Sequence, residues 1–144
     1  MLQEMWSNGF STGASWLDEL HFGIAKSLRR ASGAPDPDFG RAYNDLLADL
    51  EMVFREEEEK MADSDPVAAR SHREQHAQVL HGLHCAHGQV LDGDLHLGRQ
   101  IATELLPRWL SFHMATMDVP LFRRSSDSSI SESASATSAC PSTS

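Results

Sequence analysis

The chain has little cysteine, little basic charge and no long hydrophobic run. Only two of its 144 residues are cysteine, so neither a disulfide framework nor a CxxC metal site is expected. No segment approaches the roughly 20 apolar residues that cross a bilayer, and the first 15 residues lack the basic flank and apolar run of a signal peptide. These absences predict a cytoplasmic protein with no membrane partner.

Basic residues are also too few and too scattered for a nucleic-acid surface. The chain has 12 Lys and Arg residues against 21 Asp and Glu residues, and its net charge is −9. Arg29–Arg30 and Arg123–Arg124 are its longest basic runs, so no nucleic-acid partner is expected. The length suits one domain of ordinary size, which we expect to be a monomer.

The composition changes near the C-terminus. From Arg123 the sequence reads RRSSDSSISESASATSACPSTS, which is rich in serine and almost free of large apolar residues. Such a segment buries too little surface to offset its ordering entropy. We therefore predict a domain over residues 1–124 and a disordered Ser-rich tail over residues 125–144.

Apolar residues recur every three or four positions, and no stretch alternates strictly, so the pattern predicts helices and no strands. Capping and breaker residues delimit four of them. The first helix is predicted from Ser15, with Asp18 as its capping partner, to before Gly33, and the second from Asp36 to about Met61. The third is predicted from Asp65 to near Gly88 or Asp92–Gly93. The fourth is predicted from about His96 to Phe122, with a kink at Pro107.

Short connections join neighbouring helices antiparallel, so the expected fold is all-α, an up-down-up-down four-helix bundle. Residues 1–14 would form a non-helical arm whose Trp6 and Phe10 pack on the bundle.

One glutamate of the run REEEEK is predicted to face inward. At about 100° per residue, Glu57 shares a narrow arc with Leu50 and Val53. Its neighbours Glu56, Glu58 and Glu59 are turned away by about 100° or more, so we expect them to form a solvated face.

Histidines lie on the apolar stripes of the other helices. His72 and His76 are one turn apart, a spacing at which two imidazoles can share a metal ion, although alone it is a weak signal. His21 lies between Leu17 and Ile24, where a lone histidine is more often a hydrogen-bonded core residue than a ligand. The fourth helix contributes His113, with Asp118 behind it. His81 and His84 are expected at the surface, His96 near a turn, and His87 as a hydrogen-bonded core residue.

Each predicted helix thus has at least one inward-facing ionisable side chain, which is unfavourable in an apolar core. The set is His21, Glu57, His72, His76, His113 and Asp118. Buried carboxylates are costly unless a cation compensates them, so the combination predicts a metal site. Imidazole and carboxylate donors without thiolate suit iron, manganese or zinc, and carboxylates can bridge two such ions in a bundle core.

These motifs resemble the hemerythrin family, four-helix di-iron proteins that bind dioxygen. The resemblance covers about residues 6–122 and rests on WLDELHFGIAKSL with His21, FREEEEKM with Glu57, HREQH with His72 and His76, WLSFH, and HMATMD with His113 and Asp118. It implies two non-haem iron ions with an oxo or hydroxo bridge, held by the six residues above, with Glu57 and Asp118 bridging. It also implies that Leu110, Trp109 and Met114 line the oxygen pocket.

The sequence departs from the family at one ligand. The family pattern on the second helix is HxxxE, and this chain has Val53 where that histidine should stand. His21 is then the sole terminal ligand of the second iron. Three possibilities stay open for the missing ligand: water or hydroxide, Glu56 reaching around the helix, or none, if the second metal is weakly held.

The position of Asp118 depends on the resemblance. Residues five apart are separated by about 140° on an ideal α-helix, so Asp118 joins the stripe of His113 only through a widened turn or an approach from the flank.

The function implied by the resemblance is binding of dioxygen or a related small ligand, as a carrier, a store or a sensor. Two alternatives are a di-iron enzyme acting on peroxide or nitric oxide, and a degenerate, metal-poor bundle that senses or binds a partner.

Overall fold

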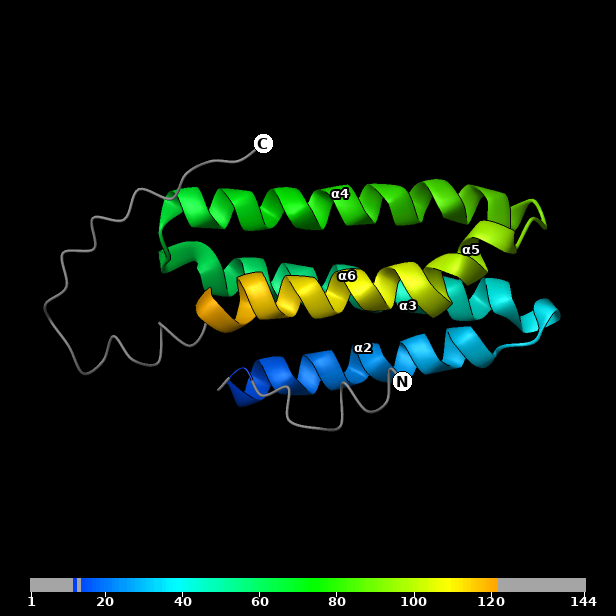
Figure 1. The fold of residues 1–144 in the computed structure, drawn as a ribbon, viewed down its shortest axis with the longest axis horizontal. Helices are drawn as coiled ribbons and strands as arrows, with labels where there is room; N and C mark the ends of the chain where they lie inside the picture. The colour runs from blue at the N-terminus through cyan, green and yellow to red at the C-terminus, as the bar shows by residue number, and fades with distance from the viewer. Residues whose placement is uncertain (1–11, 13, 122–144) are drawn as a thin grey trace, which may run out of the picture.

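The computed structural model describes Thr12 and residues 14–121, which form four antiparallel helical arms (Figure 1). The first three arms are α2 (Ser15–Gly33), α3 (Asp36–Lys60, extended by the short turn η1, Met61–Asp63) and α4 (Pro66–Leu91). The last arm is continuous and comprises α5 (His96–Gln100), η2 (Ile101–Leu105), α6 (Leu106–His113) and η3 (Met114–Asp118). The all-α four-helix prediction is confirmed, with no strand in the described residues.

Several expectations fall on other parts of the chain. The arm with Trp6 and Phe10, the helix end at Phe122 and the tail over residues 125–144 lie outside the described residues. Within the described part, no helix is long and apolar enough to cross a membrane.

All four predicted helix starts are confirmed to within one residue, but of the predicted side-chain caps only that of α4 forms. Asp65 caps α4 by accepting a hydrogen bond from the Ala68 amide at 3.3 Å, and α3 begins at Asp36. In α2, however, Ser15 is already inside the helix and no side chain caps the first turn. Asp18 instead accepts hydrogen bonds from the amide and hydroxyl of Thr12, both at 2.9 Å, which ties the preceding segment to the helix.

One end of the bundle packs too closely for a side chain on the last arm. A Cβ atom on Gly98 would lie 2.6 Å from Val90 Cγ2 and 3.0 Å from Phe39 Cε1. The glycine therefore lets α5 approach both α3 and α4, which closes the apolar core at the end away from the polar cluster described below.

The last arm contains two widened, π-helical turns. One, Ile101–Leu105, ends two residues before Pro107, whose missing N–H interrupts the α-helical ladder. The other, Met114–Asp118, directly follows His113. It supplies the wider turn that the five-residue spacing of His113 and Asp118 requires, so both side chains are buried in the core.

Candidate metal centre

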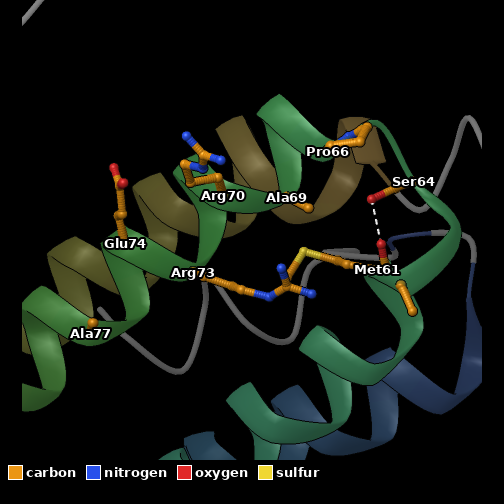
Figure 2. Close-up of a pocket in the computed structure, with 9 residues that line it drawn as sticks. Met61, Ser64, Pro66, Ala69, Arg70, Arg73, Glu74 and Ala77 are labelled. Carbon is orange, nitrogen blue, oxygen red and sulfur yellow. Dashed lines mark hydrogen bonds between the residues drawn. The ribbon is translucent and has the colours of Figure 1, made fainter.

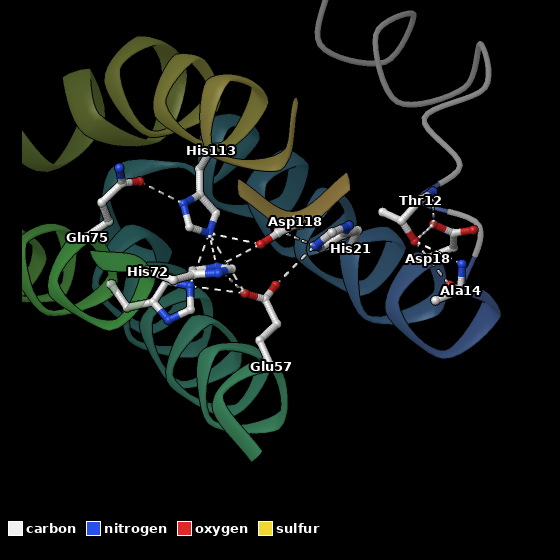
Figure 3. A network of polar contacts seen from close by, with 10 residues as sticks. Thr12, Ala14, Asp18, His21, Glu57, His72, Gln75, His113 and Asp118 are labelled. Atoms are coloured by element: carbon white, nitrogen blue, oxygen red, sulfur yellow. Dashed lines mark hydrogen bonds and ion pairs between the residues drawn. The ribbon is translucent and has the colours of Figure 1, made fainter. Parts of the chain in front are cut away.

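Six ionisable side chains meet inside the bundle, and none is more than 3% exposed (Figure 3). They come from every arm: His21 from α2, Glu57 from α3, His72 and His76 from α4, His113 from α6 and Asp118 from η3. The six residues singled out in the sequence are thus the six that the fold brings together.

Three imidazoles point the same ring nitrogen at a common centre. His113 Nε2 lies 3.0 Å from His72 Nε2 and 3.1 Å from His76 Nε2. Two donors that are each about 2.1 Å from one ion, at right angles, are about 3 Å apart. The three nitrogens therefore have the spacing of ligands that share one metal ion.

Hydrogen bonds at the outer ring nitrogens orient two of these imidazoles. His113 Nδ1 donates to Gln75 Oε1 at 3.1 Å, and His76 Nδ1 donates to Glu58 Oε1 at 3.3 Å. A proton held on Nδ1 leaves the lone pair of Nε2 facing the centre, as a metal ligand requires.

The role of Glu58 corrects the sequence-based expectation of a wholly solvated glutamate face. Its side chain is 35% exposed and contacts His76, so only Glu56 and Glu59 remain on the open surface. The contact with Gln75 was not anticipated either. Helical periodicity does not reveal these contacts because neither residue lies on the central stripe of its helix.

Aromatic rings hold the planes of the same two imidazoles. Phe54 stacks on His76 with centroids 3.9 Å apart and an interplanar angle of 6°. Trp109 stacks on His113 at 4.5 Å and 10°. With the outer hydrogen bonds, this packing fixes both the position and the direction of the two rings.

The two carboxylates lie between the three-imidazole group and His21. Glu57 Oε1 and Asp118 Oδ2 each lie 3.3 Å from His21 Nε2. Their other oxygens face the opposite side: Glu57 Oε2 is 3.0 Å from His76 Nε2, and Asp118 Oδ1 is 2.8 Å from His72 Nε2. Each carboxylate thus offers one oxygen to each side, which is the arrangement of a bridge between two ions.

The contacts around these carboxylates are close but poorly directed. Glu57 Oε2 and both Asp118 oxygens have no hydrogen-bond partner of normal geometry within the part of the chain that the structure describes. Buried carboxylate oxygens without such partners are costly. Cations at the centre would satisfy them, and the nitrogen and oxygen donors suit iron.

A known protein has a similar sequence. Bacteriohemerythrin of Ralstonia nicotianae is 32% identical over 113 residues, which cover 78% of this chain and 82% of the relative. The chain belongs to the hemerythrin family. No family model matches it, and no solved structure matches it.

In this hemerythrin-family chain, the metal-free cluster is held together by charge. Burial lowers the pKa of His21, but hydrogen bonds and Coulomb attraction from Asp118 and Glu57 outweigh it and raise the pKa to about 9. The same opposing effects raise the pKa of His72 to about 9. Burial raises the pKa of Asp118, but the close imidazoles of His113, His21 and His72 outweigh it and lower the pKa to about 2. Protons on these imidazoles occupy the place that cations would take.

Val53 lies where the family pattern has a histidine, and it is 1% exposed. Glu56, one of the three possibilities for the missing ligand, is exposed to solvent. Its side chain therefore lies on the surface of the bundle in this structure, and Glu56 as a replacement ligand stays a prediction.

The residues expected to line an oxygen pocket surround His113. Leu110 and Met114 are 1% and 2% exposed, and Trp109 is the partly exposed ring stacked on His113. The other histidines lie outside the centre: His81, His84 and His96 are exposed, and the partly buried His87 packs against Tyr43.

A surface depression lies at the corner between α3 and α4 (Figure 2). Arg70, Arg73 and Glu74 of α4 line one side, and Met61 and Ser64 line the turn. Its lining contains none of the six clustered residues.

Proposed function

We propose that this chain is a non-haem di-iron protein that binds dioxygen reversibly, as a carrier, a store or a sensor. The observation that supports this most is the placement of Glu57 and Asp118, whose paired oxygens face His21 on one side and three imidazoles on the other. Membership of the hemerythrin family supports iron as the metal and dioxygen as the ligand.

In this proposal the six residues divide between two ions. His72, His76 and His113 hold one ion and His21 holds the other, with both carboxylates and an oxo or hydroxo group as bridges. A pair of ferrous ions would supply the electrons that reversible dioxygen binding requires.

The chain's own apolar residues protect that chemistry. Leu110 and Met114 are almost fully buried beside His113, and the Trp109 ring covers one face of its imidazole. These side chains would exclude water and protons from the ligand site. A dry site keeps protons from the bound ligand, which prevents its irreversible loss and so favours release of unaltered dioxygen.

The second candidate is an enzyme that acts on peroxide or nitric oxide. The observation that favours it is the His21 side of the cluster, where three protein donors face one ion position: His21 Nε2, Glu57 Oε1 and Asp118 Oδ2. Open coordination positions are typical of catalytic metal sites.

The third candidate is a metal-poor bundle that binds a partner, and it predicts no bound iron.

Oxygen uptake and release separate these functions. The metal-free protein would be loaded with Fe²⁺ under anaerobic conditions, its iron measured per chain, and oxygen uptake followed with an electrode. We expect uptake of up to one dioxygen per iron pair and its recovery under argon. Continued consumption of peroxide or nitric oxide would favour the enzyme, and an iron-free protein would contradict the proposal. The cytoplasmic location, the monomeric state and the lack of a nucleic-acid partner stay predictions from the sequence.

A further inference from the structure

We infer that the two ion positions are unequal: the three-imidazole position holds a resident ion, and the His21 position holds an exchangeable one. This inference rests on the proposed function, because it concerns the same cluster. It adds that the chain is stable with a single ion bound and takes up the second only when free ferrous iron is available.

The first argument is the number of donors on each side of the carboxylates. Five residues offer donor atoms that all lie within 4.8 Å of one another: Glu57, His72, His76, His113 and Asp118. His21 is outside that group, and its Nε2 lies near the far oxygens of the two carboxylates. Among the residues that the structure describes, one ion would therefore have five donors and the other three, and metal affinity rises with the number of placed donors.

The second argument is preorganisation. Gln75 and Glu58 fix the ring protons of His113 and His76, while Trp109 and Phe54 fix their planes. Partners of this kind change metal affinity by about 10–100-fold in other proteins. These contacts all act on the three-imidazole position, so they increase the difference in metal affinity between the two ion positions.

The third argument is the residue at the position on α3 where the family pattern has a histidine. Val53 is buried one turn before Glu57, on the same face of the helix. A valine side chain offers no donor atom, and Glu56 is turned to solvent. Within the described residues, no side chain next to Glu57 on this helix supplies a fourth donor for the His21 position.

The test measures binding and retention of Fe²⁺, not oxygen chemistry. Metal-free full-length protein is titrated with Fe²⁺ under argon, then passed over a weak chelating resin and assayed for iron. We expect two binding phases whose dissociation constants differ at least about 100-fold, with one iron per chain retained. His21→Ala should remove the weaker phase and leave the retained iron unchanged.

Val53→His is the informative gain-of-ligand variant, and Val53→Leu is its matched control because it adds bulk without a donor. Val53→His should retain two irons per chain, and the dissociation constants of its two binding phases should differ by less than about 10-fold. Val53→Leu should behave like the parent. Two irons retained with equal affinity by the parent, or loss of the retained iron in His21→Ala, would overturn the inference and leave the proposed function standing. A parent that binds no iron would overturn both.

Discussion

His113 and Asp118 both contact the His72 imidazole, although they are five residues apart on one helical arm. His113 Nε2 lies 3.0 Å and Asp118 Oδ1 2.8 Å from His72 Nε2. The π-helical turn Met114–Asp118 makes this possible, because on an α-helix the two side chains would diverge by about 140°. Assembly of the cluster thus depends on an irregular turn.

Deleting Ala115 should leave the metal centre intact. The deletion shortens the spacing of His113 and Asp118 from five to four, and residues four apart on an α-helix differ by only about 40°. An α-helical turn can then replace the π turn, so iron retention should stay near that of the parent. Inserting one alanine after Ala115 is the matched control and should abolish retention. Equal behaviour of the two variants would contradict this role for the turn.

His76→Ala should remove the resident iron and lower stability. The substitution leaves Glu57 Oε2 without its contact at 3.0 Å and removes the ring on which Phe54 stacks. Removing the partner of a buried acceptor such as this oxygen costs about 1–3 kcal/mol. Iron content and urea unfolding would be compared with those of His81→Ala, an exposed histidine on the same helix. We expect no change in that control, and parental iron content in His76→Ala would refute its assignment as a ligand.

The metal-free protein should be most stable in mildly acidic solution. The pKa values of His21 and His72 are raised from 6.5 to about 9, so their contribution is complete below pH 6.5 and is lost as pH rises through about 9. The pKa of Asp118 is lowered from 3.8 to about 2, so its contribution is present above pH 3.8 and is lost as pH falls toward 2. Urea midpoints should therefore be highest between about pH 4 and 6.5. A midpoint that is higher at pH 9.5 than at pH 5.5 would contradict the charged network.

Iron binding should have the opposite dependence on pH. The same imidazoles must lose their protons to become ligands, so binding releases protons and affinity should increase as pH rises from 6.5 to 9. Anaerobic titrations with Fe²⁺ in buffers of different ionisation enthalpy would count the released protons. Release of none at pH 7 would show that the imidazoles are already neutral.

Gly98→Ala should destabilise the bundle without touching the metal centre. The added methyl would lie 2.6 Å from Val90 Cγ2, so α5 must move outward at a cost of about 1–3 kcal/mol. A Cβ atom added to Gly82 on α4 would meet nothing within 4 Å, and Gly82→Ala should raise stability by about 0.5–1 kcal/mol. Thermal unfolding of both variants provides the comparison, and equal effects would contradict the close packing.

The helical fold and the inward direction of Glu57, His72 and His76 could be predicted from the amino-acid sequence. Local periodicity carries this information, since a residue on an apolar stripe must point at the core wherever the neighbouring helices lie. The place of Asp118 needed more than periodicity, because a widened turn cannot be read from spacing alone. The resemblance to the hemerythrin family supplied it.

The contacts between the polar groups, by contrast, depend on how the four helices pack together. Glu58 and Gln75 contact imidazoles from positions that periodicity assigns to the flank or the surface, and Phe54 and Trp109 stack on rings from other helices or other turns. The division of each carboxylate between His21 and the three imidazoles likewise depends on the relative placement of four helices. Such placement is set by packing between distant segments, so no local pattern in the sequence encodes it.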